Sequence, residues 1–417
     1  MNFSRAFAMI PCCLTRLLAG LALLAPALDG AQAQIAVRGE TIHTAAGAPI
    51  HDGVVVIRDG KIAAVGPAAS TPIPAGFRVL QAKVVTPGLI DAHSTVGVSG
   101  MLNQKQDQDQ LDKSGPIQPE LRAVDSYNSL DPLVDWMRSL GTTTLHTGPG
   151  PGALISGQSL VIKTAPQNLD AATLIADATI VGNIGPEALS GAKDKAPSSI
   201  AKSIAMLRSE FTKAQEYQRK LAVADAEKRP ARDLHLEALA GALDMKKPVM
   251  ITVQRHQDIL AALRLAEEFH LRLILDGAAD AEQVLEPIRK SGFPVILHPT
   301  MARAEDALQN ASMGTAAALQ KAGILFALQS GFESYVPKSR VVLFEAAIAA
   351  GHGLPFDQAL ASITFNAARI LGLDHRIGSI ESGKDADLAL FDGDPFEYTS
   401  HCTGTVVSGV LVHEGAK

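Results

Sequence analysis

The stretch that decides the fold is Val84-Val85-Thr86-Pro87-Gly88-Leu89-Ile90-Asp91-Ala92-His93-Ser94-Thr95. Its apolar run predicts a buried strand that ends near His93. Side chains two positions apart in a strand point to the same face, so His93 and Thr95 face the same way. Two histidines at this spacing can chelate one cation, whereas the neutral hydroxyl of Thr95 is a poor ligand for zinc. The stretch therefore predicts a strand end that carries half of a metal chelate.

The chain is long enough to bury a large hydrophobic core. It has 417 residues, of which 47% are hydrophobic and 19% are charged. These values are ordinary for a globular protein. The length fits a barrel of about 250 residues with a smaller domain beside it.

The first 33 residues have the pattern of a secretory signal. Arg5 and Arg16 precede the apolar run Leu17–Ala25, and Ala31-Gln32-Ala33 supplies a small-residue cleavage site. The alternative, a membrane anchor, needs roughly 20 apolar residues, and this run is shorter. No other segment is apolar enough over that length. We therefore expect a periplasmic or secreted protein that is not inserted in a membrane after residues 1–33 are removed.

Charge and cysteine content exclude several kinds of partner and site. Removing residues 1–33 changes the net charge from −6 to −7, which disfavours nucleic acid and anionic membranes as partners. Cys12 and Cys13 lie in the predicted signal, which leaves only Cys402 in the mature chain. The mature protein therefore has no internal disulfide and no cysteine cluster for a metal.

Both ends of the mature chain have the pattern of short strands and turns. Asp59-Gly60 separates two β-branched runs and predicts a tight hairpin. Gly378–Asp392 and Gly404–Val412 have the same character. We interpret residues 34–86 and 374–417 as one small discontinuous β-sandwich domain. The alternative is two unrelated β segments.

Residues 87–373 alternate between apolar strand-like runs and helical patterns, which predicts a parallel sheet with helical crossovers. The runs are at 142–145, 249–253, 271–275, 294–297 and 324–328. Helices are expected at 280–291 and from Ser198 to about Lys228, the second with an apolar stripe that packs on the sheet. A closed barrel is favoured over an open doubly wound sheet, and an NAD enzyme is disfavoured, because no glycine-rich phosphate loop follows an early strand.

Three motifs in order resemble one known family. Besides Pro87–His93, the stretches Phe365–Leu373 and Gly378–Leu388 look like the end of an imidazolonepropionase-like member of the amidohydrolase superfamily. The resemblance implies an α/β fold, a (β/α)8 TIM-type barrel with a β-sandwich built from both termini, and a site at the C-terminal ends of the strands. It also implies that a divalent metal such as zinc activates a water that attacks an amide or cyclic imide carbonyl.

Several positions depart from the family pattern. Thr95 stands in place of the second histidine on the first strand, and Thr252 or Gln254 stands in place of a histidine on the fifth. Asp276 replaces a histidine on the sixth strand, and its oxygens can still bind a divalent cation. After the eighth strand, Gln329–Phe332 lacks the aspartate that shuttles protons. The resemblance therefore implies a reduced or atypical metal site.

The candidate site residues are the polar side chains near predicted strand ends. We predict that His93, His146 and Lys163 hold the metal, Lys163 as a carboxylated bridge, and that Asp276 and His298 are catalytic. The alternatives are a solvated tip for Lys163 and a structural role for His298. His256 is better explained as a solvated or capping residue at a helix start.

Two functions from different classes follow from these residues. The first is an exported hydrolase that acts on C–N bonds other than ordinary peptide bonds, in a small cyclic or peptide-like amide. The second is a catalytically degenerate barrel that serves as a binding or structural protein, because a site short of several ligands loses metal affinity. A serine hydrolase is disfavoured because Ser156 lacks the flanking glycine of a nucleophile elbow. The sequence is compatible with a homo-oligomer.

Overall fold

The structure is a computed structural model. It describes residues 34–102, 104–165, 169–190, 196–223, 225–332 and 341–415. The predicted signal at 1–33 therefore lies outside the described residues. None of the described helices is long and apolar enough to cross a membrane.

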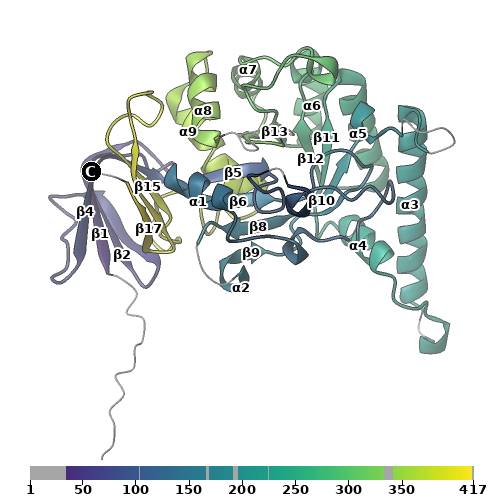
Figure 1. Cartoon of the computed structure of the whole chain (residues 1–417), viewed down its shortest axis with the longest axis horizontal. Helices are drawn as coiled ribbons and strands as arrows, with labels where there is room; N and C mark the ends of the chain where they lie inside the picture. Colours follow the sequence, from purple (N-terminus) through teal and green to yellow (C-terminus); the bar gives the residue numbers. More distant parts are fainter. Residues whose placement is uncertain are drawn as a thin grey trace, which may run out of the picture. The chain divides into compact units, whose positions relative to one another are not determined.

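A seven-stranded sheet takes strands from both ends of the described chain, as Figure 1 shows by the purple and yellow strands lying together. In spatial order the strands are β17 (Val410–Glu414), β16 (Cys402–Val407), β15 (Leu388–Phe391), β4 (Arg78–Pro87), β1 (Ile35–Ile42), β2 (Ile50–Arg58) and β3 (Lys61–Pro67). Strand β4 joins the two ends, because it pairs parallel with β1 and antiparallel with β15. The discontinuous β domain is therefore one hydrogen-bonded sheet. The division of the chain after residues 86 and 373 stays a prediction.

Local sequence explains how this sheet turns. Asp59 and Gly60 have φ angles of 52° and 75°, the positive values of a tight hairpin turn, and they connect β2 to β3 as predicted. Ile35, Val55 and Leu388, from three different strands, belong to one buried cluster. The two ends of the chain thus share a hydrophobic core.

Eight strand positions close into a barrel. Four strands form one sheet: β5 (Leu89–Ser94), β6 (Thr142–Thr147), β8 (Leu160–Lys163) and β9 (Thr173–Ile175). Six form the other: β7 (Gly157–Gln158), β10 (Ile180–Asn183), β11 (Val249–Val253), β12 (Leu273–Gly277), β13 (Val295–Leu297) and β14 (Phe326–Leu328). β7 and β8 are consecutive and pair with β10 and β6, respectively, which joins the sheets on one side. A bridge from Ser94 to Gly331 joins them on the other.

The third barrel position runs in the direction opposite to the one predicted. Strands β7 and β8 are antiparallel to β10 and β6, whereas β10 to β14 are parallel to one another. The link between β6 and β7, residues 148–156, is shorter than the dozen or so residues that a parallel crossover usually takes. The chain therefore turns back at the barrel mouth, and β8 ends at the opposite end of the barrel.

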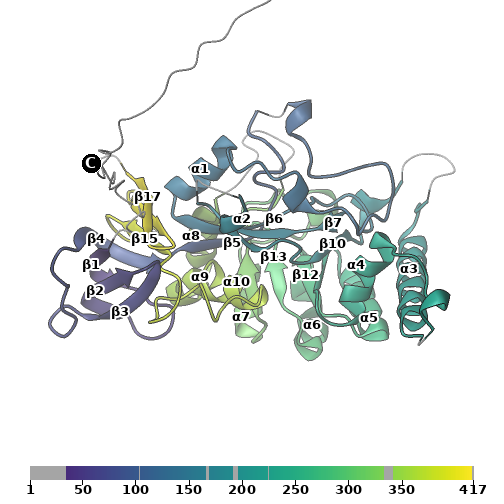
Figure 2. The same cartoon turned by 90° about the horizontal axis from the view of Figure 1, so that it is seen from below.

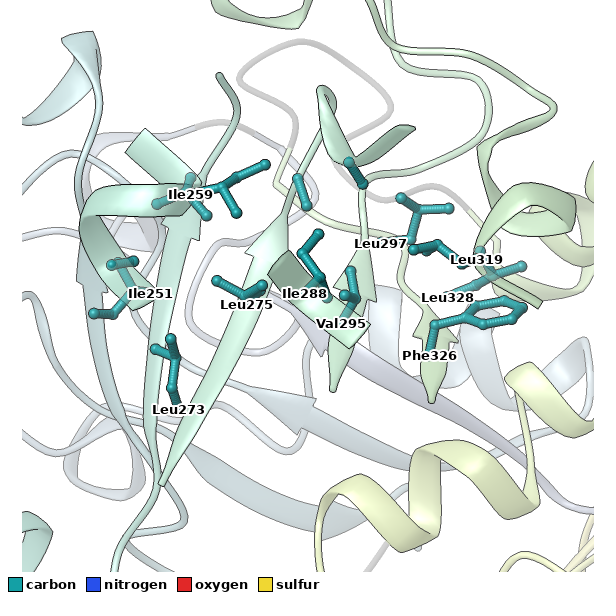
Figure 3. Close-up of a cluster of buried hydrophobic side chains, with 14 of the residues drawn as sticks. Ile251, Ile259, Leu273, Leu275, Ile288, Val295, Leu297, Leu319, Phe326 and Leu328 are labelled. Atoms are coloured by element: carbon teal, nitrogen blue, oxygen red, sulfur yellow. The ribbon is translucent and has the colours of Figure 1, made fainter. Parts of the chain in front are cut away.

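Helices cover the outside of the barrel. They are α1 (Pro132–Ser139), α2 (Leu169–Ala172), α3 (Ile200–Leu221), α4 (Leu234–Leu243), α5 (His256–Phe269), α6 (Leu285–Ser291), α7 (Thr315–Lys321), α8 (Val342–Gly351), α9 (Phe356–Ser362) and α10 (Phe365–Ile370). Figure 2 shows α4, α5 and α6 beside β10, β12 and β13. In Figure 3, Ile259 of α5, Ile288 of α6 and Leu319 of α7 point toward the outward side chains of the strands, in one buried cluster.

The long helix α3 is shorter than predicted. It starts after Ser199, whose hydroxyl accepts the backbone N–H of Lys202, and it ends at Leu221. Its buried face includes Leu207, Phe211 and Tyr217. The helix ends about one turn beyond Tyr217, which is its last buried residue.

Gly88 joins the β domain to the first barrel strand, and a side chain does not fit there. A Cβ atom on Gly88 would lie 2.2 Å from the hydroxyl oxygen of Thr143. The Pro87-Gly88 step therefore lets β4 continue directly into β5 against the neighbouring strand β6.

Candidate active site at the strand ends

The inward side chains of the parallel strands change from apolar to polar toward their C-terminal ends. Val181, Met250, Ile274, Ile296 and Ala327 form an apolar layer inside the barrel. Two positions further along each strand the inward residues are polar, since successive inward side chains are two residues apart. These residues, together with His93 and His146 at the ends of β5 and β6, form the strand-end layer: Asn183, Thr252, Asp276, His298, Gln329, His93 and His146. All seven side chains are buried.

Asp276 is the centre of the hydrogen bonding in this layer. Its Oδ1 accepts hydrogen bonds from His93 Nδ1 at 2.9 Å and from Gln329 Nε2 at 2.8 Å. Its Oδ2 accepts the hydroxyl of Thr252 at 2.6 Å. Burial opposes ionisation, but the charge of His93 and these three donors hold the pKa of Asp276 below its ordinary value. Asp276 is therefore a carboxylate with three protein donors.

His93 is the partner charge. Burial, the largest single effect, lowers its pKa, but the charge and hydrogen bond of Asp276, together with Asp91 and the backbone of Pro149, raise the pKa above the ordinary value of histidine. Its Nε2 has no hydrogen-bond partner among the described residues, although the backbone of Pro149 lies near enough to favour the charged ring. Within the part of the chain that the structure describes, His93 therefore presents a buried Nε2 near the backbone of Pro149 with no close hydrogen-bond acceptor.

His146 lies beside His93 but uses both of its ring nitrogens. Its Nδ1 donates to the carbonyl of Ala92 at 2.6 Å, and its Nε2 accepts the hydroxyl of Ser159 at 2.7 Å. The centres of the His93 and His146 rings are 6.1 Å apart. Burial, helped by the nearby His93, lowers the pKa of His146 to about 4. The ring is therefore neutral and structural, and neither nitrogen is available to a metal.

This depressed pKa predicts that His146 makes the fold sensitive to acid. The unfolded chain takes up a proton at this residue as the pH falls below about 6.5, whereas the folded protein resists protonation until about pH 4. Between pH 7 and 4.5 the residue is expected to remove about 2 to 3 kcal/mol from the free energy of unfolding. Urea unfolding of the wild type and of His146→Gln at both pH values measures this difference.

The exposed His375 provides the control for that experiment. His375→Gln should keep the wild-type pH dependence, and His146→Gln should lose the acid-sensitive part of it. Equal pH dependence in the wild type and His146→Gln would show that His146 is not the group that titrates.

Lys163 is not brought to the strand-end layer. It is the last residue of β8, and the reversed direction of that strand puts it at the other end of the barrel. Its Nζ lies 2.6 Å from Asp385 Oδ2, 3.0 Å from Asp387 Oδ2 and 2.7 Å from Ser408 Oγ. As a carboxylated bridge, Lys163 would need a neutral Nζ beside the other predicted ligands. As a solvated tip, its side chain would need to be exposed. The structure instead shows a buried ion pair with the β domain.

His298 is in the strand-end layer, where it follows β13. Its Nδ1 donates to the carbonyl of Pro299 at 2.7 Å, and its backbone N–H donates to Gly277 of the neighbouring strand at 2.8 Å. His256 begins α5 and its backbone N–H donates to Asp280 Oδ2 at 2.8 Å. Its side chain is 50% exposed, which agrees with its interpretation as a solvated or capping residue at a helix start.

Asn183 and Gln329 are members of the layer that the sequence did not single out as candidates. Asn183 ends β10, in register with Thr252 and then Asp276 on the next two strands. Both side-chain atoms of Asn183 lack a hydrogen-bond partner among the described residues. The sequence signal that could have found these residues is a polar residue two positions beyond a buried apolar residue of the same strand. An unsatisfied buried amide is costly, so Asn183 is a candidate to bind a ligand.

A cavity of about 290 Å³ adjoins Pro149, whose backbone lies near the ring of His93. Pro149 lines it, together with Gln110 and Ser156. Four carboxylates line it as well, against a single arginine that pairs with one of them: Asp109, Asp112, Glu120, Asp125 and Arg122. This charge favours neutral or cationic molecules over anionic ones.

Comparison with known proteins agrees with the barrel. The model of the amidohydrolase family matches residues 188–412, more than half of the chain. The chain belongs to the amidohydrolase family. An amidohydrolase from Thermotoga maritima MSB8 has a similar structure, with 28% identity, a TM-score of 0.86 and coverage of 92% of this chain and all of the other. This result confirms the predicted fold class.

Two curated relatives extend the comparison in sequence. The imidazolonepropionase of Sphingopyxis alaskensis is 25% identical over 371 residues, which cover 84% of this chain and 88% of the relative. The amidohydrolase tasK of Hapsidospora irregularis is 27% identical over 380 residues, which cover 83% of this chain. The match covers only 38% of tasK's own length. The resemblance to imidazolonepropionase-like amidohydrolases is thereby confirmed.

Amidohydrolases generally use a divalent metal, and the donors in this chain do not fit one. Among the described residues, no three histidine, cysteine or carboxylate side chains gather closely enough to hold an ion. The oxygens of Asp276 face three protein donors, and His146 has no free nitrogen. Lys163, the third predicted ligand, is at the opposite end of the barrel. We therefore derive no catalytic step through a metal.

Proposed function

We propose that this amidohydrolase is exported and hydrolyses a C–N bond, other than an ordinary peptide bond, in a small neutral or cationic amide. The observation that carries the proposal is the Nε2 of His93, which lies inside the buried strand-end layer without a close hydrogen-bond partner among the described residues. The match to the imidazolonepropionase over most of both chains supports the reaction class. The acidic lining of the neighbouring cavity supports the charge of the substrate.

The strand-end layer supplies part of what amide hydrolysis needs. A water oxygen bonds to the carbonyl carbon, the C–N bond then breaks, and the products are a carboxylic acid and an amine. The Nε2–H of His93 can donate to the carbonyl oxygen as negative charge develops on it. Asp276 keeps the ring oriented for this role, and Thr252 and Gln329 in turn hold Asp276.

This proposal predicts that turnover depends on His93. The protein purified after export is incubated with cyclic imides, lactams, imidazolones and N-acyl amines, and the released carboxylic acid is quantified. His93→Ala is expected to lower kcat by about 100-fold or more, the usual effect of losing one oxyanion donor. The N-terminal residue of the same preparation is expected to be Gln34.

Controls keep this experiment interpretable. His375→Ala should retain wild-type turnover because its side chain is exposed and outside the layer. Circular dichroism spectra establish that His93→Ala is folded. Equal turnover in His93→Ala and the wild type would refute the role of His93, and the absence of turnover with every compound would refute hydrolysis.

A second function, ligand binding without hydrolysis, is favoured by the state of Asp276. Its hydrogen bonds to His93, Thr252 and Gln329 occupy three of its roughly four lone-pair positions, which makes it a poor group to accept a proton from water. Calorimetric titration of the same compounds separates the two functions. Binding without product formation indicates the degenerate barrel, and product formation indicates the hydrolase.

A further inference from the structure

We infer that the strand-end layer of this barrel functions without a bound divalent cation, because protein hydrogen bonds around Asp276 occupy the position of a metal centre. The inference concerns the site used in the proposed function, but it holds whether that site hydrolyses its ligand or only binds it. It assigns the task of binding a carbonyl oxygen to the side chain of His93.

The hydrogen-bond donors around Asp276 oppose the binding of a cation. A carboxylate has about four lone-pair positions, and three of them here face N–H or O–H donors at 2.6 to 2.9 Å. A cation bound to either oxygen would have to displace at least one of these donors. Each displaced donor would be left unpaired in a buried layer, which is unfavourable because no water is there to replace the lost acceptor.

Too few other strong ligands surround His93 to complete a zinc site. A histidine held through Nδ1 by a carboxylate, as His93 is, also has the usual arrangement of a zinc ligand. Whether zinc could bind therefore depends on the other possible ligands near His93. His146 is the neighbouring imidazole, and its two nitrogens bond Ala92 and Ser159. Thr95 and Thr252 offer only neutral hydroxyls. Among the described residues, no three histidine, cysteine or carboxylate side chains gather closely enough to supply the three or more strong ligands that zinc needs.

The hydrogen bonds of His146 and Asp276 belong to a network that extends to neighbouring strands. The hydroxyl of Ser159, which donates to His146, lies 2.7 Å from Thr179 Oγ1 and also accepts the Thr179 backbone N–H at 3.1 Å. On the other side, Gln329 donates to the carbonyl of Ile296 as well as to Asp276. A metal would have to break contacts that several strands share.

The test is the metal content and thermal stability of the purified, exported protein. The protein is dialysed against zinc or manganese and then against metal-free buffer, and the metal is quantified by mass spectrometry. We expect less than about 0.1 equivalent of metal, and a melting temperature that neither chelator nor zinc changes.

His93→Gln separates a site in the layer from binding elsewhere. Metal above that level in the wild type that disappears in His93→Gln would overturn the inference. Metal that is retained in His93→Gln lies outside the layer, and the inference stands. If His93→Gln is unfolded, Asp276→Asn, which removes the carboxylate at the centre of the layer, takes its place and is read in the same way.

Turnover distinguishes this inference from the proposed function. Turnover that continues in chelator supports both. If turnover is lost in chelator and restored by zinc, the inference is wrong and the hydrolase function stands. If no compound is hydrolysed, the hydrolase function fails while the metal content still decides the inference.

Discussion

Replacing Asp276 by alanine is expected to lower the free energy of unfolding by about 3 to 5 kcal/mol, the usual cost of breaking a buried ion pair from one side. The change removes the acceptor of His93, Thr252 and Gln329 together. Each of these donors is buried, so water cannot replace the carboxylate without entering the barrel. Urea unfolding at pH 7, followed by the fluorescence of the single tryptophan, Trp136, measures the loss.

Two variants define what the loss means. Asp276→Asn keeps the size of the side chain but removes its charge, so it separates the charge from the shape. Glu267→Ala removes an exposed carboxylate from α5 and is expected to change stability by less than about 0.5 kcal/mol. A loss below about 1 kcal/mol in Asp276→Ala would contradict a tightly hydrogen-bonded layer.

Replacing Lys163 by methionine is expected to have an effect of similar size at the other end of the barrel, about 3 to 5 kcal/mol. Methionine fills most of the space of the lysine stem but leaves the carboxylates of Asp385 and Asp387 without their shared cation. Asp385 keeps ion pairs with Lys61 and Arg376, whereas the remaining donor to Asp387 among the described residues is the backbone N–H of Ser408 at 2.7 Å. Unfolding in urea is again the measurement.

A double-mutant cycle tests the cause of this second loss. Lys163→Met with Asp387→Asn removes both charges of one pair and should recover part of the stability, because no unpaired charge is left on Asp387. Lys213→Met, which removes an exposed lysine paired with Glu210, is the matched control and should cost less than about 1 kcal/mol. Equal losses for the Lys163 and Lys213 variants would refute a buried ion cluster.

The fold was largely predictable because its main signals are local. The Asp59-Gly60 turn depends on two adjacent residues that adopt positive φ angles. The strand-like runs of the barrel core are continuous and apolar, so their positions can be obtained from the sequence. Because alternate residues of a strand face the same side, the sequence also shows which residues share a face. Asp276 and His298 lie two residues beyond Ile274 and Ile296, and this spacing alone places them on the inner face of the barrel.

The direction of β8 was not predictable from its residues. The run Leu160–Lys163 has the same apolar pattern in either direction, and only its pairing with β6 and β10 decides which end of the barrel it reaches. That pairing moved Lys163 from a predicted metal site to the ion pairs with Asp385 and Asp387.

The sequence by itself determined the barrel, the shared β domain and the presence of His93 at the end of the first barrel strand. Only the tertiary structure decided the chemistry around His93. Its bond to Asp276 joins residues 183 positions apart, and the bond from Gln329 to Asp276 spans 53. No local pattern encodes such pairs, because the strands that carry them become neighbours only when the barrel closes. The same closure engages both nitrogens of His146 in hydrogen bonds and makes half of a metal chelate part of a hydrogen-bonded layer.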